Sequence, residues 1–288
     1  MRDILTSPRV IEIRHNRRMY RLRLFILFFI LFISIVGALS FFSSNKHIII
    51  DKILITGTHI IDQEEIEKEI LKDMSGKYIY LFSKNNSFIY PHKEIYSNLR
   101  LNFPRIESLS VSRDNLKTLH VDVSERTGSF LYCGASIPEN KDDVGENCYF
   151  INNDGFIFDK APYFSGNVYF KYYITLEDGI INPLGKQILS INQFHKIMRF
   201  IDKITSIGFK PIYIVIGQDN INYLYLNHKV NDTIPMIIFK NDDDLDILQD
   251  NLSLAMKKKE FAEELNSKYT KLLYIDLRFK NKVLYKFE

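Results

Sequence analysis

The segment "LLYIDLRFKNKVLYKFE" (residues 272–288) decides which fold we expect at the C-terminal end of the chain. Hydrophobic and polar side chains alternate along it twice, first over residues 272–280 and again over residues 282–288. Alternation with a period of two is typical of β-strands that bury one face. The sequence therefore predicts two short strands. Because the second strand stops on the last residue, Glu288, we predict that it lies at a sheet edge, where another chain can pair with it.

The predicted edge strand has two chemically different faces. Val283, Tyr285 and Phe287 lie on one face, and Lys282 and Lys286 lie on the other. A chain that adds a strand to an edge gains affinity from main-chain hydrogen bonds and specificity from the alternating side chains. Lysines on an edge strand also discourage unspecific pairing. The pattern is thus consistent with a docking edge and with a protected terminal strand.

The segment belongs to a β-rich domain that we predict for residues 126–288. Turn signals such as Asn153-Asp154-Gly155 separate its short hydrophobic runs. Helical periodicity appears from about Gly185 to Ser206 and again in residues 242–259, with a break expected near residues 257–260. We predict a mixed sheet with two helices packed on it. The predicted strands are residues 129–134, 147–152, 156–162, 170–176, 211–217, 221–227, 235–240 and the two strands of 272–288.

A smaller block precedes this domain, at residues 47–125. Asp62 with Glu65 forms a capping box at the start of one helix, and Pro91 opens a second helix. A strand at 47–57 precedes the helices, and strands at 106–113 and 117–126 follow them. The predicted order is β-α-α-β-β, with the helices on one face of a small sheet. The predicted fold class of the whole chain is α+β.

The N-terminal region combines a basic tail with an apolar segment. Residues 1–23 contain seven Arg and carry a net charge of +5, whereas the other residues sum to −2. The segment "LFILFFILFISIVGALSFF" (24–42) has no charged residue and, as a helix, would span roughly 28 Å, about one hydrocarbon core. Basic residues on its N-terminal side predict that the N-terminus lies in the cytoplasm and that the rest of the chain, after the apolar segment, lies outside the membrane. A cleaved signal peptide is the alternative, because Ala38-Leu39-Ser40 resembles a cleavage site; the length of the apolar run favours a retained anchor in the lipid bilayer.

The chain has two cysteines, Cys133 and Cys148, both in the predicted outer part. Disulfides persist in such compartments. A bridge would close a polar, turn-rich loop, and we predict it, although two unrelated thiols are the alternative. No His spacing of metal-site type, nucleophile motif or phosphate-binding loop occurs, so we expect neither metal, cofactor, small-molecule substrate nor nucleic acid. The run "NDDDLD" (241–246) lacks the spacing of a calcium loop, and helix capping explains it.

Four segments follow one another after the basic tail and the apolar segment. They are "ILITGTHIIDQEEIEKEIL" (53–71), "PRIESLSVSR…LKTLHVDVSERTG" (104–128), "YFINNDGFIFDKAP" (149–162) and "LLYIDLRFKNKVLYK" (272–286). Taken together and in this order, they resemble the bacterial cell-division protein family FtsQ/DivIB. The resemblance implies a POTRA domain followed by a C-terminal β domain.

The resemblance implies a non-enzymatic scaffold of the divisome at the division septum of the inner membrane. It implies binding to two small bitopic coiled-coil proteins, FtsB-like and FtsL-like, in support of septal peptidoglycan synthesis. The POTRA-like block is implied to recruit other divisome components. Two alternatives are another POTRA-containing factor for envelope assembly or secretion, and a membrane-tethered extracytoplasmic enzyme. The partner-binding residues that the resemblance implies are Lys282, Val283, Leu284, Tyr285, Lys286, Phe287 and Arg278.

Overall fold

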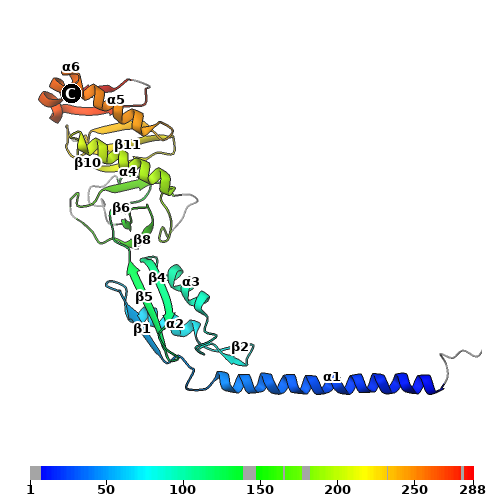
Figure 1. The fold of residues 1–288 in the computed structure, drawn as a ribbon. Helices are drawn as coiled ribbons and strands as arrows, with labels where there is room; N and C mark the ends of the chain where they lie inside the picture. Colours follow the sequence, from blue (N-terminus) through cyan, green and yellow to red (C-terminus); the bar gives the residue numbers. More distant parts are fainter. Residues whose placement is uncertain (1–7, 139–146, 165, 177–181, 232, 280–281) are drawn as a thin grey trace, which may run out of the picture. The chain divides into compact units, whose positions relative to one another are not determined.

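The computed structural model describes residues 8–138, 147–164, 166–176, 182–231, 233–279 and 282–288. The chain divides into two compact units (Figure 1). Unit 1 consists of Met1–Asn102 and Ser108–Glu125, and unit 2 of Phe103–Glu107 and Arg126–Glu288. Helices and strands occur in both, and unit 2 contains a large sheet, so the predicted α+β class is confirmed.

The N-terminal helix α1 (Pro8–Ser43) contains the predicted apolar segment. Among the described residues it supplies one stretch, Asn16–Ser43, that is long and apolar enough to cross a membrane. Proline is favoured at the first position of a helix because its missing N–H has no partner there. The helix therefore extends beyond the apolar run and includes most of the basic tail, while residues 1–7 of that tail lie outside the described residues.

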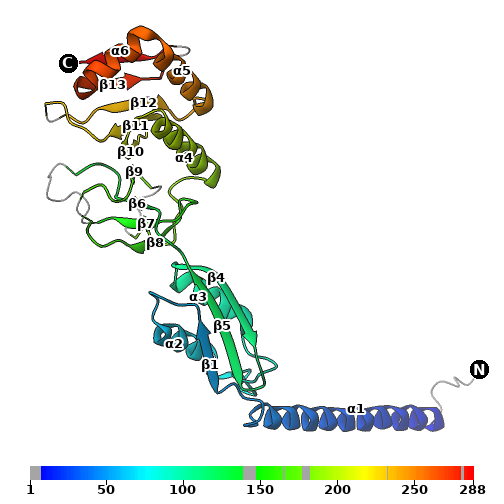
Figure 2. The same cartoon turned by 60° about the vertical axis from the view of Figure 1, so that its left-hand side comes forward.

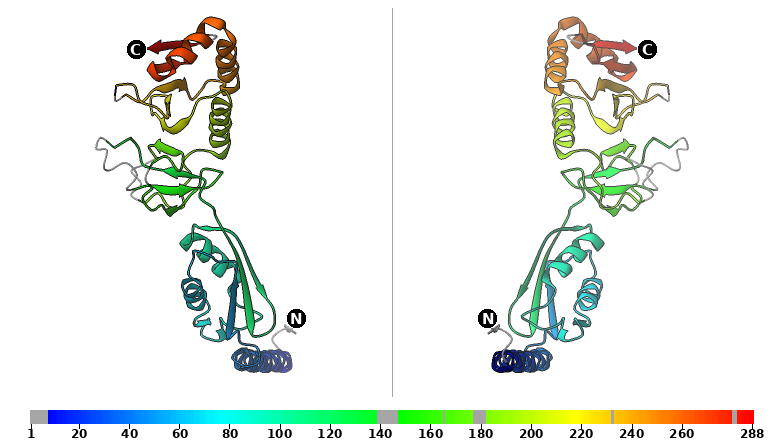
Figure 3. Two further views of the ribbon diagram at one scale, coloured as in Figure 1. Left: turned by 90° about the vertical axis from the view of Figure 1, so that its left-hand side faces the viewer. Right: turned by 90° about the vertical axis from the view of Figure 1, so that its right-hand side faces the viewer.

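The rest of unit 1 contains a three-stranded sheet in the order β1-β5-β4, with β1 parallel to β5. Figures 2 and 3 show the helices α2 and α3 on one face of this sheet. A short hairpin, which the sequence did not predict, lies between the two helices in the chain. The element order is otherwise the predicted β-α-α-β-β. The bounds are β1 (Lys52–Thr56), α2 (Gln63–Asp73), β2 (Lys77–Tyr78), β3 (Phe82–Ser83), α3 (His92–Asn102), β4 (Ile106–Arg113) and β5 (Thr118–Glu125).

Unit 2 is built on a nine-stranded sheet in the order β14-β13-β12-β11-β10-β9-β6-β7-β8. Antiparallel pairs dominate it, but β9 runs parallel to both β10 and β6, and β12 runs parallel to β13. The strands are β6 (Phe130–Tyr132), β7 (Tyr149–Ile151), β8 (Ile157–Lys160), β9 (Lys171–Ile174), β10 (Pro211–Ile216), β11 (Ile221–Leu226), β12 (Met236–Lys240), β13 (Leu272–Asp276) and β14 (Leu284–Phe287).

Three helices, α4 (Ile191–Ser206), α5 (Leu245–Lys257) and α6 (Lys259–Lys268), pack their apolar sides on one hydrophobic core with the sheet. The predicted break near residues 257–260 is confirmed, because α5 ends at Lys257 and a separate helix, α6, begins at Lys259. The predicted start of the first helix at Gly185 is wrong. Gly185 has φ 77°, outside the range of right-handed helices, and Ser190 caps α4 by accepting a hydrogen bond from the Gln193 amide.

Cys133 and Cys148 form a disulfide in the structure. Cys133 follows β6 and Cys148 precedes β7, and these two strands pair antiparallel. The bridge thus joins the two strands at the end where the intervening loop leaves them. In the chain-entropy model, a bridge around a loop of this length contributes roughly 3 kcal/mol by restricting the unfolded chain.

We expect the double variant Cys133→Ser, Cys148→Ser to lose roughly 3 kcal/mol of unfolding free energy because the unfolded chain regains that freedom. Urea unfolding of the variant and of the oxidised wild-type protein measures the difference. As a control, adding a reductant should leave the unfolding midpoint of the variant unchanged. Equal unfolding midpoints for oxidised wild type and variant would show that the bridge contributes nothing to stability.

Candidate functional site

The strand β13 ends at Asp276 because its side chain turns the chain. The Asp276 carboxylate accepts a hydrogen bond from the Arg278 amide, with 3.0 Å between N and Oδ1. This contact of an Asp with the backbone two residues on is a common turn device. The predicted first strand is therefore too long, because residues 277–279 are not part of a strand; Lys280, where the prediction ended, lies outside the described residues. A register shift between Leu272 and Tyr274 also interrupts the regular alternation that we predicted.

Arg278 returns over Asp276 and forms a fork with its carboxylate. Nε lies 2.9 Å from Oδ1, and Nη2 lies 2.6 Å from Oδ2. The Asp276 side chain is 7% exposed and that of Arg278 is 31% exposed. Burial raises the pKa of Asp276, but the hydrogen bonds and charge of Arg278, together with the charge of Lys240, outweigh burial and hold this pKa below its ordinary value. Arg278 thus has a structural role in addition to any contact with a partner.

This pair predicts a pH dependence of stability. Because the pKa of Asp276 is lower in the folded protein than in the unfolded chain, its contribution is complete above the unfolded pKa, about 4, and disappears as the pH falls through the folded pKa. We expect acidification below about pH 4 to reduce the unfolding free energy of the wild type more than that of Asp276→Asn. Urea unfolding at a series of pH values measures both slopes. Identical slopes would contradict the ion pair.

The strand β14 forms one end of the nine-stranded sheet, with β13 as its neighbour among the described residues. The two strands pair antiparallel, with Ile275 opposite Tyr285 and Asp276 opposite Leu284. Lys282 and Val283 precede the strand, so the predicted docking strand is slightly longer than the observed one. The predicted edge position agrees with the observed strand order. In Figure 1 the C-terminus lies at this end of the sheet, close to α6.

The main-chain groups of β14 alternate in direction. The Glu288 amide donates to the Lys271 carbonyl at 2.9 Å, so it points into the sheet. Along an antiparallel strand every second residue points the same way. The main-chain N–H and C=O groups of Lys286 and Leu284 therefore face β13, whereas those of Tyr285 and Phe287 face away from the sheet. This outward set is what an added strand requires.

The side chains of β14 separate into two sets as predicted. Val283, Tyr285 and Phe287 are half-buried and pack against the main core of unit 2. Lys282, Leu284 and Lys286 are exposed, and Leu284 retains 45% of its accessible surface. An incoming strand would thus meet a face with lysines around one leucine and an opposite face continuous with the hydrophobic core.

Helix α6 supports β14 from the core side. The rings of Phe261 and Tyr285 lie 4.4 Å apart between centroids, and the Tyr285 hydroxyl donates to Glu264 Oε2 at 3.3 Å. Phe261 is 3% exposed. Asn231 Nδ2 also donates a hydrogen bond to Glu288 Oε1 at the end of the strand. The sequence analysis did not identify Phe261 or Glu264 as part of the site. The only signal was that Phe261 does not continue the row of apolar residues that lies along one side of the preceding helix.

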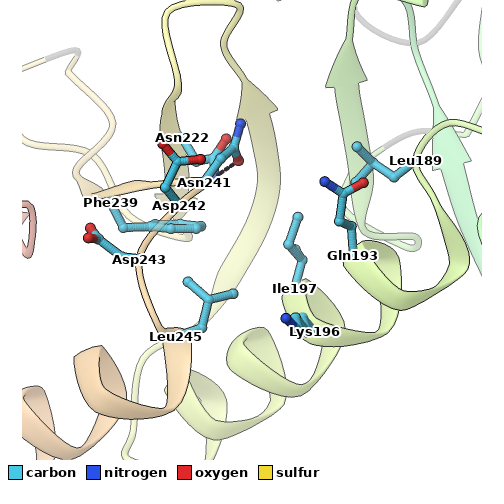
Figure 4. A pocket seen from close by; sticks show the side chains of 10 residues that line it. All are labelled: Leu189, Gln193, Lys196, Ile197, Asn222, Phe239, Asn241, Asp242, Asp243 and Leu245. Atoms are coloured by element: carbon cyan, nitrogen blue, oxygen red, sulfur yellow. Dashed lines mark hydrogen bonds between the residues drawn. The ribbon is translucent and has the colours of Figure 1, made fainter.

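A separate cavity of about 200 Å³ lies in unit 2 between β11, β12 and the first turns of α4 and α5 (Figure 4). Asn222 donates from Nδ2 to Asn241 Oδ1, and both lie across the cavity from Gln193 and Lys196. Asn222 Oδ1 has no hydrogen-bond partner among the described residues. The lining includes no His, Cys, Ser or Thr. In the described part of the chain, no three His, Cys, Asp or Glu side chains are grouped to hold a metal ion.

Comparison with models of known protein families gives no match to this chain, and no curated protein matches it significantly. The fold and the site therefore define the class by themselves. The chain is an α+β protein with one N-terminal helix that is long and apolar enough to cross a membrane, and a large sheet that ends at β14.

Proposed function

We propose that this protein is a non-enzymatic, single-pass membrane scaffold of bacterial cell division, with its N-terminus in the cytoplasm. In this proposal β14 pairs with a strand of an FtsB-like bitopic protein, which brings an FtsL-like protein with it and supports septal peptidoglycan synthesis. The observation that carries the proposal is the edge position of β14, with the main-chain groups of Tyr285 and Phe287 directed outward. A strand that presents unpaired donors and acceptors is a template for pairing.

Unit 1 supports the same proposal through its topology. Apart from the β2–β3 hairpin, its order β-α-α-β-β agrees with the POTRA-like order that the resemblance implies. We propose that this POTRA-like part recruits other divisome components. The length and composition of α1 and the basic residues before the apolar segment support the membrane anchor and its orientation.

Localisation in dividing cells tests the proposed function. A fluorescent protein fused to the N-terminus should gather at midcell, because a divisome scaffold works at the septum. Capture of an FtsB-like protein from the same cells should accompany it. An even distribution around the cell periphery would contradict the divisome assignment and would favour an envelope-assembly factor or a tethered enzyme.

A further inference from the structure

We propose that the tip of the β2–β3 hairpin, Ile79–Leu81, inserts into the outer interface of the bilayer that α1 crosses. The inference rests on the membrane-anchoring part of the proposed function, because it takes α1 as the spanning segment. It adds a second, separate contact with lipid. The hairpin that makes this contact belongs to unit 1 and follows α1, β1 and α2 in the sequence.

The tip exposes apolar side chains on an unusual backbone. Ile79 is 83% exposed and Tyr80 is 94% exposed. Their φ values are 50° and 62°, in the left-handed region that branched and bulky residues rarely adopt. This backbone turns both side chains outward at the end of a two-residue ladder. Strained backbone of this kind concentrates at sites where binding is part of the function.

Hydrogen bonds place this tip beside the last turn of α1. Ser40 Oγ donates to the Leu81 carbonyl at 2.7 Å, and the Ser83 amide donates to Ser43 Oγ at 3.1 Å. Asn86 Nδ2 also donates to the Ser43 carbonyl at 2.9 Å. Figure 1 shows the hairpin alongside this end of the helix. The hairpin and the end of α1 are therefore held together by both side-chain and main-chain groups.

The contact with Ser40 sets the depth of the tip. Ser40 lies two residues before the end of the apolar run at Phe42, which corresponds to about 3 Å along a helix axis. If α1 spans the bilayer, the Leu81 carbonyl lies level with the end of the hydrocarbon region. Ile79 and Tyr80, next to Leu81, then lie where the chains meet the headgroups.

The composition of the surroundings fits that depth. Tyrosine is enriched at membrane interfaces because its ring is apolar and its hydroxyl reaches water or headgroups. Lys46 lies three residues after the end of α1, and Lys77 lies two residues before the tip; both are exposed. Lysines at this level attract the phosphates of anionic lipids. An exposed apolar tip with one lysine beside it in the sequence and a second lysine shortly after α1 is chemistry that a lipid surface recognises.

The absence of tryptophan from the sequence permits a direct test. A single Trp is introduced into the full-length protein at Tyr80, and in parallel at Ile79, and each variant is reconstituted in phosphatidylethanolamine–phosphatidylglycerol vesicles. Phosphatidylcholine brominated near the headgroup or near the chain ends is added as a quencher. Phe32→Trp, in the middle of α1, and Phe42→Trp, at its end, provide deep and shallow references. Ile60→Trp, exposed in the β1–α2 loop, provides the reference for water.

We expect Tyr80→Trp and Ile79→Trp to lose fluorescence to headgroup-proximal bromine as strongly as Phe42→Trp does, with emission shifted to shorter wavelength than that of Ile60→Trp. If Phe32→Trp is quenched by deep bromine while both tip variants behave like Ile60→Trp, the tip insertion is overturned and the anchor stands. If Phe32→Trp itself escapes quenching, the membrane anchor fails, and the insertion fails with it.

Discussion

Tyr285→Pro should abolish capture of an FtsB-like partner by the full-length protein. The Tyr285 amide points away from β13, so proline there removes a donor that only an added strand would use. Proline is tolerated on edge strands when its position faces solvent. The partner carbonyl left without a donor costs about 1–3 kcal/mol, which alone weakens binding by roughly five- to 150-fold. The clash of the ring with an incoming strand adds to that loss.

The matched control is Tyr285→Ala, which removes the same ring from Phe261 and Glu264 but keeps the amide. We expect the two variants to have similar unfolding midpoints, because both lose the ring and neither loses a hydrogen bond to β13. The alanine variant loses the same support from Phe261, so its affinity should fall below that of the wild type, but it should still bind the partner more tightly than the proline variant. Titration of the purified partner measures both affinities. Capture by the proline variant at the level of the alanine variant would exclude docking through the main chain of β14.

Phe261→Ala should destabilise unit 2 by about 3–5 kcal/mol and loosen β14. Such a cost is typical when a buried phenylalanine is truncated and its surroundings relax only partly. Phe261 is 3% exposed and lies under the ring of Tyr285, so the cavity opens directly beneath the edge strand. Urea unfolding measures the loss of stability. Partner binding should weaken in the same variant, because the strand that must pair is then less ordered.

Phe279→Ala provides the comparison for this variant. Phe279 lies just beyond Asp276 and is 48% exposed. Exposed positions without special contacts usually change stability by less than about 0.5 kcal/mol. Equal losses for the two variants would show that α6 does not support β14 in the way described above.

The alternation of side chains was enough to predict that two strands lie in residues 272–288 and which side chains share a face of β14, but not where β13 ends. Burial of one face requires a period of two, and residues 282–288 keep that period without interruption. The break between α5 and α6 was predictable for a similar reason. Phe261 and Leu265 are both buried, but they do not continue the row of apolar residues along one side of α5.

Features that depend on distant contacts were not predictable. The parallel pairing of β1 with β5 joins segments more than sixty residues apart, and no local pattern specifies it. The support of Tyr285 by Phe261 depends on how α6 crosses beneath the sheet edge. The hairpin β2–β3 was missed because Ile79 and Tyr80 adopt left-handed conformations that glycine usually marks in a sequence.

Residue-resolved amide hydrogen exchange of β14, with and without the FtsB-like partner, tests the central claim most directly. In the free protein, the Leu284 and Lys286 amides should be protected by β13, whereas those of Tyr285 and Phe287 should exchange rapidly. On addition of the partner, the Tyr285 and Phe287 amides should become protected as well. A tight complex in which these two amides still exchange at their free rates would contradict strand addition at β14.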